Sequence, residues 1–250
     1  MRLAIVVPTY NEALNLPLLV PRVVAARDEV DLFIVDDGSP DGTGAVAEGL
    51  GREHDGRVHL VQRTTKSGRG GAVLAGLIAA RDTGRYDLFG EMDADLSHQP
   101  EELHRLLEVA DEADLVVGSR YLPGSRIEGW PLQRRVMSRL ANRLIRTVLG
   151  VPMSDHTNGY RLYSGRAVDL LASKPLRETG FISLSEWAVT LHRHGMTIRE
   201  VPITFINRRL GVSNAGLAEV GDAFRGLIRV RRHLPELVGS SDAVDSARQS

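Results

Sequence analysis

One run of this chain ends in two carboxylates a single residue apart: Tyr86-Asp87-Leu88-Phe89-Gly90-Glu91-Met92-Asp93-Ala94-Asp95. In an extended backbone, residues i and i+2 project to the same side, so the carboxylates of Asp93 and Asp95 can converge on one point. Such a pair offers oxygen ligands to Mg²⁺ or Mn²⁺ and leaves coordination positions for phosphate oxygens. An acidic pair at a strand end is also typical of a solvated turn, so the functional interpretation depends on the rest of the chain.

Short apolar runs alternate with helical patterns through about residue 118. The expected strands are Leu3–Val7, Asp31–Val35, Arg57–Val61, Tyr86–Met92 and Asp114–Val117, and the expected helices lie near 13–26, 42–52, 71–83 and 100–111. This alternation predicts an α/β fold with a mostly parallel central sheet, right-handed crossovers and helices on both faces. Ligands of such sheets bind beyond the carboxyl ends of the strands, which is where the unusual residues of this chain fall.

The pattern changes after about residue 130. We expect a basic helix at Leu132–Leu149, a short extended piece at Gly159–Tyr163, a helix at Ser183–His194 and a strand at Thr197–Ile206. A last helix, about 215–234, has an apolar stripe at helical spacing with Arg225, Arg229 and Arg232 beside it. This stripe either packs on the sheet or meets a membrane surface. The polar tail at 237–250 is expected to be disordered.

Composition narrows the classes of protein. Of the 250 residues, 42% are hydrophobic, and the formal net charge of −1 gives no general attraction to nucleic acid. The chain has no cysteine, which excludes disulfides, thiolate metal sites and cysteine nucleophiles. No apolar run reaches the roughly 18 residues that span a bilayer, and the first residues are typical of a strand rather than of a signal peptide. We therefore expect a cytoplasmic protein.

Positive charge is concentrated in one segment. Between Arg120 and Arg146 the chain has seven arginines and one acid, Glu128. Such a segment is a solvated helix face, a contact for nucleic acid, or a surface that binds another phosphate-bearing ligand. The histidines match no standard metal-site spacing, and Trp130 and Trp187 are interpreted as packing residues.

Two loops leave alternatives open. Asp36-Asp37-Gly38-Ser39 ends an apolar strand, and its carboxylates either cap backbone amides or bind donor groups of a nucleobase or ribose. Lys66-Ser67-Gly68-Arg69-Gly70-Gly71 precedes a helix but fits neither the Walker pattern nor the dinucleotide-binding pattern. A glycine-rich helix start with one lysine near a nucleotide remains a plausible interpretation.

Taken together, these motifs resemble a known family. The first half of this chain resembles the nucleotide-sugar half of glycosyltransferase family 2, an inverting group with the GT-A (Rossmann-like) fold. The matching segments are Pro8-Thr9-Tyr10-Asn11-Glu12, Asp36–Thr43, Lys66-x-Gly-x-Gly and Asp93-Ala94-Asp95. The dolichol- and polyprenol-phosphate mannosyltransferases of that family resemble it at Gly118-Ser119-Arg120-Tyr121, Trp130-x3-Arg134-Arg135-x2-Ser138, Asp155-x-Thr157-x-Gly159-Tyr160-Arg161 and Val201-Pro202-Ile203-Thr204-Phe205-x2-Arg208. The resemblance covers about residues 3–214.

The resemblance implies a single GT-A catalytic domain at 1–236, with a nucleotide-sugar half at about 1–118 and an acceptor half at about 119–236. The implied activity is inverting transfer of a hexose, with mannose from GDP-mannose favoured, to a polyprenyl monophosphate at the cytosolic membrane surface. A separate membrane-protein partner is compatible with it. The alternatives are another donor such as UDP-glucose, another acceptor, or a non-catalytic α/β protein that binds phosphate or nucleic acid. The acid pair and the neutral total charge favour an enzyme without a nucleic-acid partner.

The resemblance also assigns residues. The donor site would comprise Pro8, Tyr10, Glu12, Asp37, Asp41, Lys66, Asp93 and Arg208, with Asp37 and Asp41 on the base or ribose. Asp93 and Asp95 would hold Mg²⁺ or Mn²⁺ on the donor diphosphate. Arg120, Arg134 and Ser138 would receive the acceptor phosphate, and Asp95, Arg120 and Arg134 would be the catalytic residues. Two departures are Asn214, where the family often has lysine, and Ser97, where some relatives have glutamine.

The expected chemistry needs cations rather than a base. The phosphate of a lipid acceptor is already an anion and an adequate nucleophile. A metal for the departing diphosphate and arginines for the incoming phosphate therefore suffice. The arginine-rich segment at 120–146 meets that requirement.

Overall fold

The computed structural model describes residues 1–64, 68–174, 176–207 and 217–238, of which 217–223 and 235–238 are described by their backbone only. Lys66, Arg208, Asn214 and the predicted tail from residue 239 onward lie outside the described residues.

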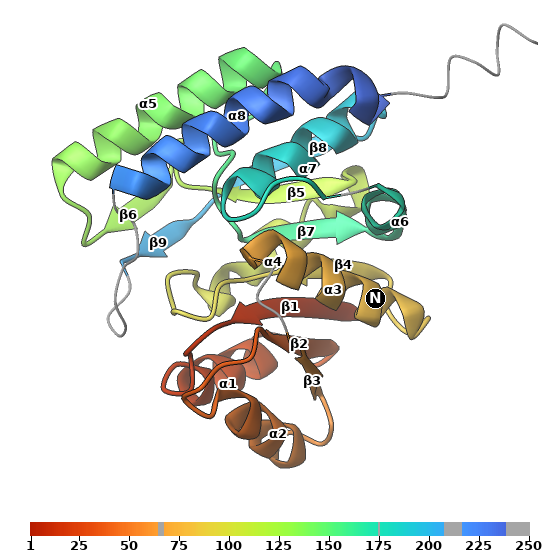
Figure 1. The fold of residues 1–250 in the computed structure, drawn as a ribbon. Coiled ribbons are helices and arrows are strands. Elements are labelled where there is room, and N and C mark those ends of the chain that lie inside the picture. The colour runs from red at the N-terminus through yellow and green to blue at the C-terminus, as the bar shows by residue number, and fades with distance from the viewer. Residues whose placement is uncertain (65–67, 175, 208–216, 239–250) are drawn as a thin grey trace, which may run out of the picture.

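A seven-stranded sheet forms the centre of the molecule, in the order β3-β2-β1-β4-β7-β5-β8 (Figure 1). Its strands are β1 (Leu3–Thr9), β2 (Val30–Asp36), β3 (Val58–Gln62), β4 (Leu88–Glu91), β5 (Leu115–Ser119), β7 (Arg161–Ser164) and β8 (Ile198–Pro202). All neighbours are parallel except β7, which pairs antiparallel with β4 and β5. The predicted mostly parallel sheet is confirmed. The insertion of the reversed strand β7 between β4 and β5 is not visible in the sequence pattern.

The first half alternates as predicted. Its helices are α1 (Leu16–Ala26), α2 (Thr43–Glu53), α3 (Gly68–Asp82) and α4 (Leu103–Leu107), and two 3-10 turns, Pro100–Glu102 and Ala110–Glu112, flank α4. The helix expected at 100–111 is therefore three short pieces. The segment begins with Pro100, whose missing N–H is harmless in a first turn.

The second half adds helices and a small sheet. Its helices are α5 (Leu132–Leu149), α6 (Gly165–Ser173), α7 (Ile182–Arg193) and α8 (Leu217–Val238). A two-stranded parallel sheet pairs β6 (Arg126–Glu128) with β9 (Thr204–Ile206). The strand expected at Thr197–Ile206 therefore divides between two sheets, β8 in the large one and β9 in the small one. Sequence patterns missed α6 and β6.

Two hydrophobic cores cover the two faces of the large sheet. Along β1, Ala4 and Val6 pack with the helices α3, α6 and α7, whereas Leu3, Ile5 and Val7 pack with α1, α2 and α4. All five side chains are buried, as expected for a strand that faces helices on both sides. The predicted covering of both faces is confirmed.

The helix α5 is unusually exposed for an ordered helix. Its buried residues are Asn142, Ile145 and Leu149, whereas five large apolar side chains face solvent: Leu132, Val136, Met137, Leu140 and Leu144. It lies beside α8 at the opposite end of the molecule from α1 and α2 (Figure 1). Among the described residues, no helix combines the length and apolar character needed to cross a bilayer.

Candidate functional site

A cavity of about 230 Å³ opens at the carboxyl ends of β1, β2 and β4. These strands are neighbours in the sheet, so the loops that follow them meet at one edge. We call this the donor cavity; it is lined by Pro8, Thr9, Tyr10, Glu12, Asp37, Gly68, Arg69, Ala72, Asp93, Ala94, Asp95 and Phe181. The structure thus brings together Pro8, Tyr10, Glu12, Asp37, Asp93 and Asp95 from the predicted site.

The acidic pair lies just beyond β4. The strand ends at Glu91, and Asp95 is already in a turn, so the pair is not part of an extended strand as the sequence argument assumed. Oδ1 of Asp95 accepts a hydrogen bond from the backbone N–H of Ser97 (3.1 Å). Between them, Leu96 has a positive φ of 62°, a strained conformation for a leucine. The turn therefore sets the direction of Asp95, and both carboxylates still line one cavity.

Asp93 is held by an arginine that the sequence analysis did not assign to the site. Arg69 donates from Nε and Nη2 to Oδ1 of Asp93 (3.0 and 2.7 Å) and from Nη1 to Oε2 of Glu91 (2.7 Å). Burial, the largest single influence, would raise the pKa of Asp93, but the charge and hydrogen bonds of Arg69, together with nearby His98 and Arg120, outweigh it and lower that pKa to about 2. Asp93 is therefore ionised throughout the physiological pH range.

A buried histidine fixes the backbone beside Asp93. Nδ1 of His98 accepts a hydrogen bond from the N–H of Asp93 (3.2 Å), which assigns its proton to Nε2, and Nε2 lies 2.9 Å from Oδ1 of Asn158. The Asn158 amide in turn donates to the carbonyl of Gly118 at the end of β5. His98 thus ties the end of β4 to the end of β5.

The residues that could hold a metal are few. Within the described part of the chain, no group of three or more histidine, aspartate or glutamate side chains is arranged to hold a metal ion. Asp93 and Asp95 supply two carboxylates at one cavity. This is the donor set expected of a site that binds Mg²⁺ or Mn²⁺ through one or two carboxylates, waters and the phosphates of a substrate.

The aspartates in the loop after β2 have different roles: two hold the loop in place, and a third lines the cavity. Asp36 accepts hydrogen bonds from the N–H of Ser39 (3.1 Å) and from Nε2 of Gln62 (2.8 Å), which hold the turn. Asp41 accepts from the N–H of Thr43 (3.0 Å) and from that of Ala13 (3.1 Å), which joins the β1 and β2 loops.

Asp37 is the acid of this loop that lines the cavity, and Nη1 of Arg63 donates to its Oδ1 (2.8 Å). Capping is thus observed for Asp36 and Asp41. The expected contact of Asp41 with a base or ribose stays a prediction.

The second predicted cluster centres on Arg120, beyond the end of β5. Its side chain is buried against Asp155, with Nε–Oδ2 at 2.7 Å and Nη2–Oδ1 at 2.8 Å, and Nη2 also donates to Oγ1 of Thr157 (2.7 Å). Burial would raise the pKa of Asp155, but Arg120 lowers it below its usual value. Arg120 is therefore a fixed, paired cation at the floor of this cluster.

Aromatic rings join Arg120 to the other predicted acceptor residues. The guanidinium carbon of Arg134 lies 4.1 Å from the ring centroid of Trp130, and that of Arg120 lies 5.4 Å from it. Both distances are within the range of cation–π attraction. The hydroxyl of Tyr121 donates to Oγ of Ser138 (2.5 Å). We call Arg120, Arg134 and Ser138, with Trp130 and Tyr121, the cation cluster.

An aromatic path connects the cation cluster to the donor cavity. Phe205 packs edge-on against Trp130 (centroids 5.3 Å apart) and against His98 (5.7 Å). His98 is the residue bonded to the backbone of Asp93. Trp130 is buried, as the packing interpretation predicted, and its packing partners are the two arginines and the ring of Phe205, which also contacts His98.

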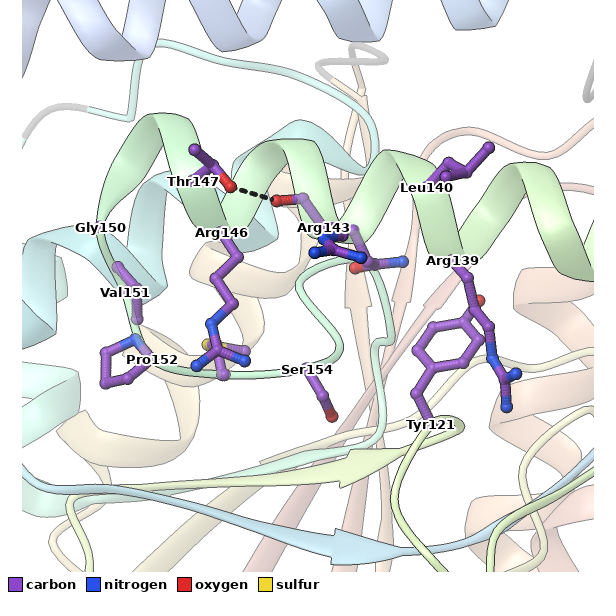
Figure 2. A pocket seen from close by; sticks show the side chains of 12 residues that line it. Tyr121, Arg139, Leu140, Arg143, Arg146, Thr147, Gly150, Val151, Pro152 and Ser154 are labelled. Atoms are coloured by element: carbon purple, nitrogen blue, oxygen red, sulfur yellow. Dashed lines mark hydrogen bonds between the residues drawn. The ribbon is translucent and has the colours of Figure 1, made fainter.

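A larger hollow of about 810 Å³ lies between α5 and the segment Gly150–Ser154 (Figure 2). The arginines Arg139, Arg143 and Arg146 line it from α5, and none of the described residues that line it is acidic. Tyr121 lines this basic hollow and also bonds to Ser138, so the hollow adjoins the cation cluster.

Several residues of the site were missed by the sequence analysis. Arg69 stands inside the quoted glycine-rich run, and Asp155 inside a quoted motif, but neither had been given a partner. The contacts of three further residues depend on the pairing of β7 with β4 and β5, which the sequence pattern does not show. These residues are Glu91, Tyr163 and Asn158.

The profile described as glycosyl transferase family 2 matches residues 4–171. The chain belongs to this family. Polyprenol monophosphomannose synthase of Mycolicibacterium smegmatis is 44% identical over 223 residues, which are 89% of this glycosyltransferase and 84% of the relative. Undecaprenyl-phosphate mannosyltransferase of Micrococcus luteus is 44% identical over 232 residues, 92% of this chain and 93% of the relative.

Solved structures agree on the fold of this family 2 glycosyltransferase. Glucosyl-3-phosphoglycerate synthase from Mycobacterium tuberculosis, in complex with Mn²⁺, uridine diphosphate and phosphoglyceric acid, superposes with a TM-score of 0.67 at 22% identity, over 95% of this chain and 78% of that one. The complex of the same enzyme with Mg²⁺ and uridine diphosphate superposes with a TM-score of 0.65 at 22% identity, over 92% of this chain and 77% of that one. The predicted family, enzyme class and GT-A fold are confirmed.

Proposed function

We propose that this glycosyltransferase transfers mannose from GDP-mannose to the phosphate of a polyprenyl monophosphate, with inversion at the sugar carbon. The names of the two relatives that are 44% identical support mannosyl transfer to a polyprenyl phosphate. The observation that carries the proposal is the position of the cation cluster. It lies next to an acidic donor cavity and is joined to it through Phe205 and His98.

In the proposed reaction, an oxygen of the acceptor phosphate attacks the anomeric carbon as the bond to the nucleotide diphosphate breaks. The acceptor oxygen is already deprotonated, so no proton has to be removed. Arg134 and Ser138 would bind the acceptor phosphate, and the charge of Arg120 would reduce repulsion between the two phosphate groups. Pro8, Tyr10, Glu12 and Asp37 would hold the nucleotide; for Lys66 and Arg208, which lie outside the described residues, donor contacts also stay proposals.

Asp93 and Asp95 would hold Mg²⁺ or Mn²⁺, which when bound stabilises the charge of the departing diphosphate. The fit rests on two carboxylates at the end of β4 that share a cavity. Structures of glucosyl-3-phosphoglycerate synthase with Mn²⁺ or Mg²⁺ and uridine diphosphate support a divalent metal in this fold.

We further propose that the enzyme is a single catalytic domain that works at the cytosolic membrane surface, where the hydrocarbon chain of the acceptor lies. The apolar side chains of α5 support this, because Leu132, Met137 and Leu140 are 76%, 61% and 56% exposed. Arg139 and Arg143 stand beside them on the same helix. An apolar stripe flanked by arginines is typical of a helix that lies in an anionic membrane interface.

The test is transfer itself. Radiolabelled GDP-mannose and UDP-glucose are each offered with a short-chain polyprenyl phosphate, with Mn²⁺ or with EDTA. We expect lipid-extractable label from GDP-mannose with Mn²⁺ and none with EDTA. Label from UDP-glucose alone would assign a different donor, and no lipid-linked label from either donor would refute the acceptor class.

A further inference from the structure

The donor cavity contains a cation, the guanidinium of Arg69, that has no role in the proposed reaction. Arg69, in the first turn of α3, binds Oδ1 of Asp93 through two nitrogens and Oε2 of Glu91 through the third. The side chain of Glu91 is 0% exposed, and its Oε1 accepts a hydrogen bond from Tyr163 (2.5 Å). Arg69 is therefore anchored on a buried carboxylate while it occupies one oxygen of a candidate metal ligand.

The fold reserves space for this guanidinium. A Cβ atom added at Gly159 would lie 1.9 Å from Nη2 and 2.7 Å from Cζ of Arg69, so a side chain at position 159 would displace the group. The ring of Phe181 covers it from another side, with Cζ 6.0 Å from the ring centroid. The side chain of Arg69 is only 13% exposed. This is a built contact rather than a surface ion pair.

We propose that Arg69 is a positioning residue for the metal site, and that it makes metal binding depend on the nucleotide diphosphate. It fixes Asp93 through Oδ1, while Oδ2, which lies 3.9 Å from Nε2 of His98, is the oxygen that we assign to the cation. Its positive charge, held against the ligand, weakens the affinity of the nucleotide-free site for a divalent metal. The inference rests on the proposed function, in which Asp93 and Asp95 hold the metal.

The physical reason is charge balance. With Glu91 engaged by Tyr163 and Arg69, the nucleotide-free site offers a divalent cation two carboxylates, one of which already binds a guanidinium. A cation placed within a few ångströms of another repels it strongly at the low effective dielectric of a partly buried site. The diphosphate of a nucleotide adds negative charge and further oxygen ligands, which offset that repulsion. The metal is then retained with the donor and released after it.

The first test compares Mn²⁺ binding by the whole protein and by the double variant Arg69→Leu/Glu91→Gln. The double substitution removes one positive and one negative charge, so the total charge is unchanged and Tyr163 keeps a hydrogen-bond acceptor. Free Mn²⁺ is followed by its paramagnetic resonance signal, without nucleotide and with GDP. We expect the double variant to bind Mn²⁺ at least about tenfold more tightly without nucleotide, and the difference to shrink when GDP is present.

A second variant moves the cation without deleting it. Gly159→Ala adds a methyl group whose close neighbours are the end of the flexible Arg69 side chain and, at 3.3 Å, Oδ1 of Asp93. It should change nucleotide-free Mn²⁺ affinity in the same direction by a smaller factor. Arg63→Leu is the matched control, because Arg63 forms a comparable pair with Asp37 (2.8 Å) in the same cavity. It should leave Mn²⁺ binding without nucleotide unchanged.

Turnover separates positioning from simple loss of structure. With saturating Mn²⁺ and donor, the double variant should turn over more slowly even though its nucleotide-free metal affinity has risen, a split that partial unfolding does not produce. Equal Mn²⁺ affinity of wild type and double variant without GDP would overturn the proposal and leave the proposed function intact. Absence of Mn²⁺ binding in both proteins, with and without GDP, would overturn the metal assignment together with this inference.

Discussion

The donor cavity and the cation cluster hold opposite charges by different means. In the donor cavity, acids line the wall, and two of them are each bound by an arginine: Asp93 by Arg69 from the start of α3, and Asp37 by Arg63 from the segment after β3. In the cation cluster, Arg134 is stacked on an indole ring, and Arg120 is both stacked and paired with a buried acid. An acidic cavity attracts a diphosphate only together with a metal, whereas the cation cluster can bind a phosphate without one. We therefore expect that chelating the metal weakens diphosphate binding in the donor cavity and leaves phosphate binding at the cation cluster unchanged.

The largest effect is expected at the acidic pair. Asp95→Asn keeps an oxygen for the N–H of Ser97 but removes the charge from the metal site, so we expect transfer to fall by at least about 1000-fold. Asp93→Ala should do the same. Circular dichroism and the melting temperature serve as controls for the fold. Retention of full transfer by Asp95→Asn in EDTA would show that this pair holds no catalytic metal.

Replacement of Arg120 should first of all lower the stability of the fold. Removing it leaves Asp155, which is 0% exposed, without its cation, and such a loss typically costs about 3–5 kcal/mol. We therefore expect Arg120→Gln to lower the free energy of unfolding in urea by this amount. Arg120→Gln/Asp155→Asn should recover most of it, because both charges are then absent. If the single variant unfolds like wild type, the ion pair is not structural and Arg120 is free to serve the acceptor alone.

Arg134→Ala tests the cation cluster by removing the guanidinium that is stacked on Trp130. Loss of one charge-assisted phosphate contact costs about 1.5–3 kcal/mol, roughly 10- to 150-fold in transfer. Arg134→Lys should recover part of this, because it restores the charge but not the planar stacking on Trp130. GDP affinity, measured by calorimetry, should stay within a few-fold. A parallel loss of GDP binding would place Arg134 in the donor site.

The smallest effect is expected at the membrane. Each arginine near an anionic surface contributes about 1 kcal/mol, so Arg143→Gln on α5 should weaken sedimentation with anionic vesicles about fivefold at low salt. Arg52→Gln, on α2 at the other end of the molecule, is the matched control and should change nothing (Figure 1). Equal effects of the two substitutions would mean that attraction is non-specific. Binding to no vesicle at any salt concentration would assign recruitment to a separate membrane protein.

The structure shows that the arginines of α8 are less informative than those of α5 in the vesicle-binding experiment. On α8, Leu227 of the predicted stripe is buried, together with Val230 and Leu234, whereas Phe224 and Ile228 of the stripe are exposed. Arg229 binds both oxygens of Glu178 (2.7 Å each), so its replacement would break an ion pair as well as remove charge. The exposed apolar face of α5 was not expected, because the sequence shows the composition of a helix but not which face its neighbours leave uncovered.

Local patterns predicted what depends on neighbours in sequence. The strands β1, β2 and β3 and the helix α5 fall within a few residues of their expected bounds, because alternation and helical spacing are local properties. The motif residues Tyr10, Asp37 and Asp93 meet in one cavity because parallel strands end at the same edge. What escaped prediction depends on long-range pairing. The place of β7 between β4 and β5, and the Arg69–Glu91–Tyr163 chain that it creates, join residues far apart in sequence.

The chain has two tryptophans, and they occupy unlike surroundings. Trp187, a residue of α7, is buried in the core beside Tyr163, whereas Trp130 lies next to the guanidinium of Arg134. Indole emission shifts with the electric field across the ring, so an anion that binds Arg134 alters the colour and intensity of Trp130 fluorescence. In a Trp187→Phe background, the remaining emission becomes a label-free optical reporter of the cation cluster. Nucleotide and lipid phosphate could then be titrated separately on the unlabelled enzyme.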